Sequence, residues 1–353
     1  MFTIYHIIFY LVFLSCCILK NNRDQQNWFW FCVWLIIFLT GIRDITNYSD
    51  LANYQSYYKT GEIEDFMMAY DINFGFDYLN KFFYGLGFSF QSFLFLVGAF
   101  IIGAYGWFIN KYSTNRLLSF AIFILINYVM SLAALRQFMA CAVILFAIDA
   151  AIKRRIVPYL IYVFIAFSFH TSAIVVLPVY FIFVVNINKR TKWILLGATV
   201  LITVGLNIIA ANLSVINEYY ANYINEENEN SVYRTLMKLF ICLLYIYALR
   251  DRIYEKDMRF MLLICLIINV VLYMGGSQIS GLYRLRNYFE ISEIIGIPLI
   301  LRYSNAAVGV KRLILRGGVI VYLVLLFISF SGILSSDGIV INSGVYKTIF
   351  GSI

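Results

Sequence analysis

Charged side chains are scarce in this sequence. Asp, Glu, Lys and Arg make up 13% of its 353 residues, whereas soluble domains carry about 25%. Hydrophobic residues make up 62%, and the mean hydropathy is +0.81. This balance excludes an ordinary soluble domain. It predicts an all-α polytopic membrane protein, because helices satisfy their own backbone hydrogen bonds inside a bilayer.

Proline and histidine are rarer still. Three prolines and no Ser/Gly-rich stretch leave no linker, so residues 1–353 are predicted to form a single transmembrane domain. The two histidines, His6 and His170, are too few for a histidine cluster. The Asp and Glu residues do not occur at the spacing of a metal-binding motif, so we expect no metal. No phosphate-cradling glycine loop is present, and we expect no cofactor. The six cysteines lie in apolar runs, which predicts small buried side chains without pairing.

Uncharged runs that suit a hydrocarbon core of about 30 Å occur at twelve places. The first run lacks a basic n-region and a small-residue cleavage site, so we expect it to be retained as a span. The twelve predicted spans begin near Phe2, Trp28, Ser92, Leu117, Phe138, Val157, Thr171, Trp193, Thr235, Phe260, Gly281 and Gly317.

Lys and Arg are unevenly distributed among the connecting segments. Eighteen of the 27 lie in one set of segments, namely 20–27, 110–116, 153–155, 186–192, 250–259 and 302–316. The positive-inside rule places this set in the cytoplasm, so both termini are predicted to face outward. Outer segments then cover about 41–91, 211–234 and 335–353. Because the net charge of +8 follows mostly from this topology, we expect no nucleic-acid partner.

Arg136 and His170 each lie at the predicted outward tip of a tight hairpin. Arg136 follows an uncharged run of nineteen residues, 117–135. The arm before His170, 157–169, has thirteen residues and is about 20 Å long, too short to cross the core. An ionisable group at that depth suggests a functional site. The alternatives are an arginine that snorkels to the headgroups and a histidine hydrogen-bonded at a helix end.

A second charged cluster lies in the segment GGSQISGLYRLRNYFEISEIIGIPL. Arg286 and Glu290 are four residues apart and Glu290 and Glu293 three apart, so the three share one face of a predicted helix. Ion pairing that lets the helix insert explains the two glutamates. For Arg284 and Arg286, near the outer leaflet, anion binding is the preferred interpretation.

The first outer segment combines charge with tyrosine. Aromatic faces beside carboxylates and amides suit sugars, although tyrosine is also common at membrane interfaces. Farther on, AYDINFGFDYLNKFF is amphipathic and is predicted to pack on the outer rim of the bundle. Arginine binds phosphate oxygens in bidentate fashion, so we expect a lipid-phosphate-linked substrate used on the outer face. The residues of this segment that we single out are Arg43, Asp44, Asp50, Tyr48, Tyr54, Tyr57 and Tyr58.

Several of these stretches, in this order, resemble a known family. They are GIRDITNYSDLANYQSYY, INFGFDYLNKFF, ALRQFMACAVILFAIDAAIKRR, FSFHTSAIVVLP and YRLRNYFEI. The sequence resembles the EpsG family, the Wzy-type polymerases of exopolysaccharide and O-antigen, over nearly the whole chain. It departs from that pattern at Asp71 and Asn73, where a Glu-Pro-Gly-like start is expected.

The resemblance implies a fold and an activity. The fold would be a bundle similar to that of the GT-C glycosyltransferases. The activity would be metal-independent formation of glycosidic bonds between oligosaccharides linked to undecaprenyl diphosphate, outside the bacterial cytoplasmic (inner) membrane. Membrane lipids and a chain-length regulator are the other expected partners. The alternatives are a flippase for the same lipid-linked units and an O-antigen ligase.

Roles for individual residues follow as hypotheses. Arg136 and Arg284, with Arg43 and Arg286, would stabilise the departing diphosphate. His170 or Asp50 would accept the proton of the attacking hydroxyl, and the sequence does not choose between them. Tyr48, Tyr54 and Tyr288 are the predicted substrate-binding tyrosines.

Overall fold

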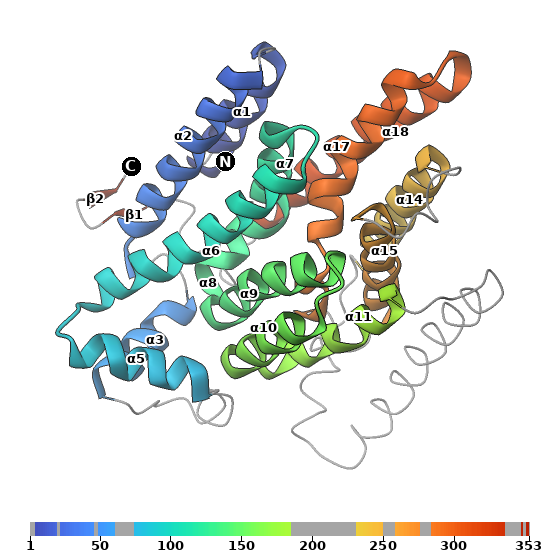
Figure 1. Cartoon of the computed structure of the whole chain (residues 1–353). Helices are drawn as coiled ribbons and strands as arrows, with labels where there is room; N and C mark the ends of the chain where they lie inside the picture. Colours follow the sequence, from blue (N-terminus) through green and yellow to red (C-terminus); the bar gives the residue numbers. More distant parts are fainter. Residues whose placement is uncertain are drawn as a thin grey trace. The chain divides into compact units, whose positions relative to one another are not determined.

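The structure is a computed structural model of the chain. It describes residues 4–19, 22–45, 49–60, 74–184, 231–249, 258–275, 284–335, 347–348 and 351–352. Nearly all of these residues are helical (Figure 1), which confirms the predicted helical fold. The exception is one short antiparallel pair, β1 (Lys347–Thr348) with β2 (Gly351–Ser352).

Helices occupy eleven of the twelve predicted span positions, and the twelfth, near Trp193, lies outside the described residues. Five stretches of the described chain are long and apolar enough to cross a membrane, namely 90–112, 116–133, 135–152, 232–249 and 309–331. The chain is therefore a membrane protein, while the count of twelve and the outward termini stay predictions. The helices at the predicted positions are α1 (Ile4–Ile18), α2 (Asn22–Gly41), α6 (Phe90–Tyr112), α7 (Arg116–Phe123) with η2 (Ile124–Tyr128) and α8 (Val129–Ala133), α9 (Leu135–Ile152), α10 (Ile156–Phe169), η3 (Thr171–Val176) with α11 (Leu177–Val184), α14 (Ser231–Leu249), α15 (Met258–Gly275), α17 (Ile291–Ala306) and α18 (Gly309–Ser335).

One predicted span begins later than expected. The run near Gly281 was predicted to enter the membrane with its charges inside the helix, but α17 begins at Ile291. Arg286 lies instead in the short 3-10 turn η4 (Arg286–Tyr288), and Glu290 is the residue that precedes α17. Arg286 and Glu290 thus precede the helix, and Glu293 lies in its first turn.

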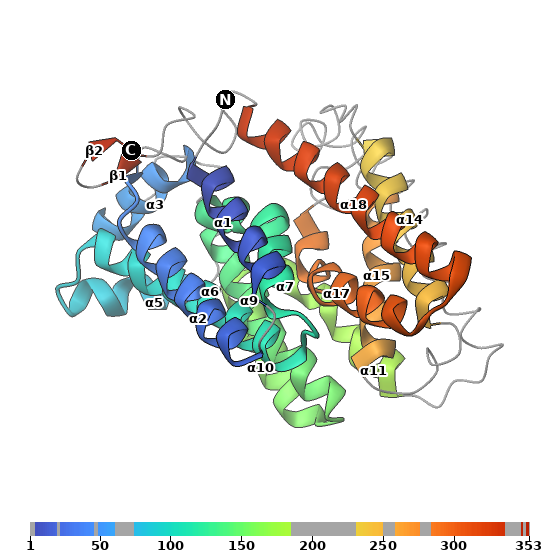
Figure 2. The ribbon, with the colours of Figure 1, turned by 90° about the horizontal axis from the view of Figure 1, so that it is seen from above.

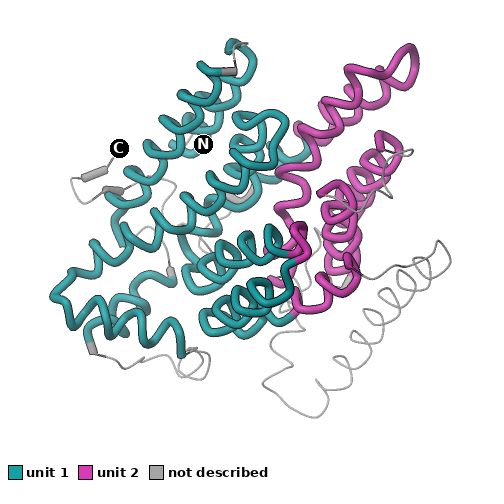
Figure 3. The backbone as a smooth tube through the Cα atoms, in the orientation of Figure 1, with its two compact units in different colours: residues 1–150, 155–174, 324–353 teal, residues 151–154, 175–323 magenta. Residues whose placement is uncertain are grey.

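The chain divides into two compact units, shown in Figure 3. Unit 1 comprises residues 1–150, 155–174 and 324–353, and unit 2 comprises residues 151–154 and 175–323. Such a division does not decide how many functional domains a chain has, so the single transmembrane domain stays a prediction.

In unit 1, α6 packs along α2, and α1 lies along α7 (Figure 2). Small residues on α6 permit its close contact with α2. A Cβ on Gly98 would lie 2.6 Å from Thr40 Cγ2, and one on Gly106 would lie 3.3 Å from Val33. Close approach at small residues is a common way for helices to pack in membranes. The Ser89 and Asn115 side chains cap the amino ends of α6 and α7.

The stretch before Arg136 changes helical form twice. It passes from α7 through a π-helical turn, η2, into α8, and the helix ends at Ala133. Ala134, with φ −84° and ψ 63°, then breaks the chain before α9 begins. No glycine or proline makes this break. Single π-turns within helices occur frequently at functional sites. The π-turn and the isolated charge of Arg136 therefore both indicate a functional site in this part of the chain.

Two short helices, α3 (Ser49–Thr60) and α5 (Phe74–Gly85), pack on each other, and α5 also packs on α10. Each has twelve residues, a length of about 18 Å, which is too short to span a bilayer. On α5, Phe76 is buried whereas Phe74, Tyr78 and Phe82 are exposed at one-turn spacing. This confirms an amphipathic helix that packs on the bundle, and its aromatic stripe is typical of a membrane interface.

We expect Gly75→Ala to weaken the docking of α5 onto α10. A Cβ at Gly75 would lie 2.2 Å from Ser168 Oγ and 2.8 Å from the Ser168 carbonyl oxygen, so the helices must separate. The matched control is Gly85→Ala at the other end of α5, where nothing lies within 4 Å. Thermal unfolding of the detergent-solubilised protein should show a lower Tm for Gly75→Ala only. Equal Tm values for both variants would contradict this contact.

All six cysteines are free, as predicted. Four are buried, Cys16 is half-buried and Cys17 is exposed. The expectation of burial is therefore wrong for Cys17, which lies on an outer face of α1. Among the described residues, no group of His, Cys, Asp or Glu could hold a metal ion.

Candidate functional site

Arg136 lies in the first turn of α9, directly after the helix break, and is 7% exposed. Its Nε donates a hydrogen bond to the Tyr54 hydroxyl at 3.3 Å, and its guanidinium carbon lies 5.8 Å from the centre of the Tyr54 ring. Tyr54 comes from α3, and its own ring contacts Phe76 of α5. The short helix α3, which packs on α5, therefore contacts and orients the arginine that the sequence singles out.

Arg43 supports the same break from the side of α2. It is fully buried, and its Nη1 donates to the Thr40 carbonyl at 2.6 Å while its Nη2 lies 3.5 Å from the Leu132 carbonyl. These carbonyls belong to the last turns of α2 and α8, where a helix has unsatisfied acceptors and favours a cation. These contacts give Arg43 a structural role. Its predicted contact with the substrate stays a prediction.

Tyr57 and Asp77 join α3 to α5. The Tyr57 hydroxyl donates to Asp77, and Lys81 donates to the other carboxylate oxygen at 2.7 Å. Burial, followed by the bond to Asp77, raises the pKa of Tyr57 above its ordinary range, so this residue stays protonated. Burial opposes ionisation of Asp77, but the bonds from Lys81 and Tyr57 outweigh it and hold the pKa of Asp77 below its usual value.

His170 ends α10 and is held by the third residue of its own His-Thr-Ser sequence. The Ser172 hydroxyl lies 2.8 Å from Nδ1, and the Ser172 backbone N–H donates to the same nitrogen at 3.4 Å. A backbone N–H can only donate, so Nδ1 accepts. The neutral ring therefore carries its proton on Nε2.

Arg136 and His170 lie at the same end of the α9–α10 hairpin. A turn at residues 153–155 joins the two helices, and Phe146 of α9 contacts Tyr162 of α10 with ring centres 5.7 Å apart. Asp50, in the first turn of α3, precedes Tyr54 by four residues and so shares its face. Tyr48 lies outside the described residues.

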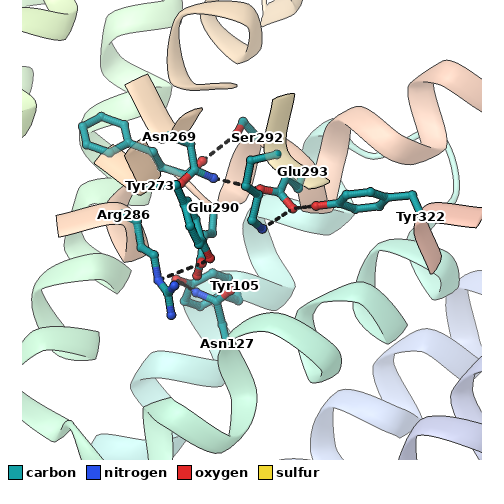
Figure 4. Close-up of polar contacts among 11 residues, drawn as sticks. Tyr105, Asn127, Asn269, Tyr273, Arg286, Glu290, Ser292, Glu293 and Tyr322 are labelled. Atoms are coloured by element: carbon teal, nitrogen blue, oxygen red, sulfur yellow. Dashed lines mark hydrogen bonds and ion pairs between the residues drawn. The ribbon is translucent and has the colours of Figure 1, made fainter. Parts of the chain in front are cut away.

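Unit 2 contains a buried polar cluster (Figure 4). Glu293, 1% exposed, receives hydrogen bonds from Lys238 at 2.7 Å, from Asn269 at 2.8 Å and from Tyr322. One carboxylate thus joins α14, α15, α17 and α18. Beside it, Glu290 accepts a bond from Tyr273 at 3.3 Å and pairs with Arg286 at 3.5 Å.

The predicted residues of unit 2 differ in exposure. Arg286 is buried, and its guanidinium lies 4.7 Å from the centre of the Tyr273 ring. Tyr288 is also buried, whereas Arg284 is exposed. The ion pairing considered for the glutamates is therefore present. The anion-binding role of Arg284 and Arg286 stays a prediction.

Sequence reasoning brought Arg136 and Tyr54 to attention separately, and the structure pairs them. It missed Asp77 as the partner of Tyr57, and it missed Lys238 and Asn269 as partners of Glu293. A signal was present for the last two, because each interrupts an apolar run, and a lone polar residue in such a run needs a buried partner.

Comparison with known proteins decides the family. The model of the EpsG family matches residues 27–342. The chain belongs to the EpsG family. No curated protein and no solved structure matches it. The family is associated with Wzy-type polymerases and exopolysaccharide biosynthesis, so this EpsG-family chain is a membrane protein of polysaccharide biosynthesis.

Proposed function

We propose that this protein is a polysaccharide polymerase that joins undecaprenyl-diphosphate-linked repeat units on the outer face of the bacterial inner membrane. Family membership supports a role in polysaccharide synthesis. The observation that carries the proposal further is Arg136, buried beside a helix break and oriented by Tyr54. Such a pre-oriented cation suits a reaction in which negative charge develops on a leaving group.

The reaction transfers a glycosyl chain. A hydroxyl oxygen of the acceptor unit attacks the anomeric carbon of the donor, the bond from that carbon to the diphosphate oxygen breaks, and undecaprenyl diphosphate leaves. Arg136 stabilises the charge on the departing diphosphate through its planar fork of donors.

Arg43 and Tyr54 act as positioning residues in this proposal. Arg43 holds the carbonyl end of α8, and Tyr54 fixes the Nε of Arg136, so both set the direction of the guanidinium. Arg284, an exposed arginine of unit 2, keeps its predicted role as a residue that binds diphosphate. Arg286 has the weaker support of the two, because Glu290 lies 3.5 Å from its Nε.

The structure favours Asp50 over His170 as the proton acceptor. Nδ1 of His170 already accepts from Ser172, so the neutral ring presents a donor at Nε2 and not a base. Asp50 lies one helical turn from Tyr54 and has a carboxylate that can take the hydroxyl proton. In this assignment His170 donates a hydrogen bond to a substrate oxygen.

One observation favours a second candidate function. Charged residues buried within the bundle are expected of a transporter, and Lys238 with Glu293 in unit 2 is such a pair. A flippase for lipid-linked oligosaccharides is therefore the alternative to test beside polymerisation.

Deletion of the gene in its native host should reduce the size ladder of the surface polysaccharide to a single lipid-linked repeat. The reason is that polymerisation is lost while flipping and ligation continue. The polysaccharide is resolved by size on a gel, with complementation by the wild-type gene as the control. Loss of every repeat from the surface would indicate a flippase, and full-length chains retained on the carrier lipid would indicate a ligase. An unchanged ladder would end the polysaccharide interpretation.

A further inference from the structure

A cavity of about 380 Å³ lies in unit 1 beside α3. Its walls come from the segment after α2, from α3, from the end of α5 and from the first residues of α6. The reaction proposed above uses none of the residues that line it. Its volume is within the range of about 300–1,000 Å³ that is typical of small-ligand sites. The residues that matter for the argument are Asp44, Gln55, Tyr58, Lys59, Tyr84 and Gln91.

The aromatic wall of the cavity is fixed in place. The Tyr58 hydroxyl donates to the Phe88 carbonyl at 2.9 Å, and the ring of Tyr58 meets that of Tyr84 edge to face, with centres 5.6 Å apart. Tyr58 is buried, whereas Tyr84 is 55% exposed. An oriented and accessible ring is suited to the apolar C–H face of a sugar.

The polar wall offers both donors and acceptors. Its polar residues are Asp44, Lys59, Gln55 and Gln91, while most of the lining surface is apolar. Gln91 donates to the carbonyls of Gly41 and Arg43, at 2.6 and 3.0 Å, which fixes the position of its amide. One carboxylate and one ammonium balance in charge, so this lining does not select an anion. Apolar surface with a few polar groups matches a sugar, which has an apolar C–H face and hydroxyl groups that both donate and accept.

The cavity lies next to Arg136 along α3. Tyr54 binds Arg136, and Tyr58, one turn later, lines the cavity, so the two positions are about 6 Å apart along the helix axis. Gln91 also connects the cavity to the backbone of Arg43. We propose that this cavity binds a sugar residue of the lipid-linked saccharide while its diphosphate end lies at Arg136. This assignment rests on the proposed function and adds a saccharide subsite to it.

Binding of lipid-free saccharide tests the assignment directly. The probe is the host's own surface polysaccharide, cut to fragments of one or two repeat units, and binding to the purified protein in nanodiscs is measured by saturation-transfer NMR. The wild-type protein should bind these fragments. Tyr84→Ala should raise the Kd about tenfold, because it removes the stacking ring, and Asp44→Asn should raise it as well.

Two controls make the result specific to the cavity. Tyr78→Ala removes an exposed tyrosine from the same helix outside the cavity, and Arg136→Lys changes the diphosphate site. Both should bind the fragments with the wild-type Kd. An absence of binding by the wild-type protein, or equal Kd values for Tyr84→Ala and Tyr78→Ala, would overturn the subsite.

The failure of the subsite and the failure of the proposed function give different results. If the subsite is wrong, deletion still collapses the polysaccharide ladder, but Tyr84→Ala binds fragments normally. If the polymerase function is wrong, deletion does not reduce the ladder to a single lipid-linked repeat, whatever the fragments bind. When both hold, cells that carry Tyr84→Ala should make a ladder with shorter chains than cells that carry Tyr78→Ala.

Discussion

Arg136→Lys is expected to lower the rate of polymerisation by about 10²-fold or more, the usual effect of removing one donor from a site of developing negative charge. Lysine keeps the positive charge but loses the planar fork and the Nε–H that donates to Tyr54. Arg136→Ala should leave only single repeats. The measurement is the size distribution of the surface polysaccharide in complemented deletion cells, with protein amounts equalised by immunoblot.

The matched control for Arg136→Lys is Arg155→Lys, at an exposed arginine before α10. This variant should give the wild-type ladder. Tyr54→Phe adds a second readout, because it removes only the hydroxyl that receives the Arg136 bond and should shorten the chains without changing the Tm. If Arg136→Lys gives the wild-type ladder at a normal protein amount, the reaction does not require the bidentate donors of the guanidinium. A parallel fall in Tm and polymerisation would make Arg136 a structural residue.

The two buried arginines of unit 1 show why position within the helix break matters. Arg43 lies at the carbonyl ends of two helices and is fully buried, where a cation is stabilised by the helix dipole. Arg136 lies at the amino end of α9, where the dipole disfavours a cation. The contact with Tyr54 stabilises this cation, and in the proposed function an anionic substrate stabilises it further.

The sequence predicts the helices and the breaks well because both depend on local composition. An isolated charge between two uncharged runs located the break at Arg136, and the spacing of Arg286 and Glu290 predicted their ion pair. Helix α17 was placed too early because its opening turn contains both apolar and charged residues. The π-turn before Arg136 has no comparable signal, since its residues are as apolar as those of the neighbouring helices.

The candidate site depends more on contacts between distant residues, which local patterns do not determine. Tyr54 is 82 positions from Arg136, and several tyrosines of α3 fit the same description in the sequence. Only the docking of α3 shows that Tyr54 contacts the arginine and that Tyr58, one turn later on the same face, lines the cavity. The proposed diphosphate and saccharide positions therefore follow one face of one helix.

Glu293→Gln is expected to be the most destabilising of the substitutions in unit 2. Removal of one partner from a buried ion pair costs about 3–5 kcal/mol, because the remaining charge keeps its desolvation penalty. The glutamine amide could still accept from Asn269, but Lys238 would be left as a buried cation without its carboxylate. Thermal unfolding in detergent should therefore show a large fall in Tm and a reduced amount of folded protein.

Lys238→Met tests the other partner of the same ion pair. It removes the cation, yet Glu293 keeps the hydrogen bonds from Asn269 and Tyr322, so the fall in Tm should be smaller than for Glu293→Gln. The double variant should recover part of the loss, because neither charge then remains buried alone. Equal and additive effects of the two single substitutions would show that the pair is not coupled. A double variant that restores the Tm but not the polysaccharide ladder would indicate that the buried charges serve the reaction or transport as well as the fold.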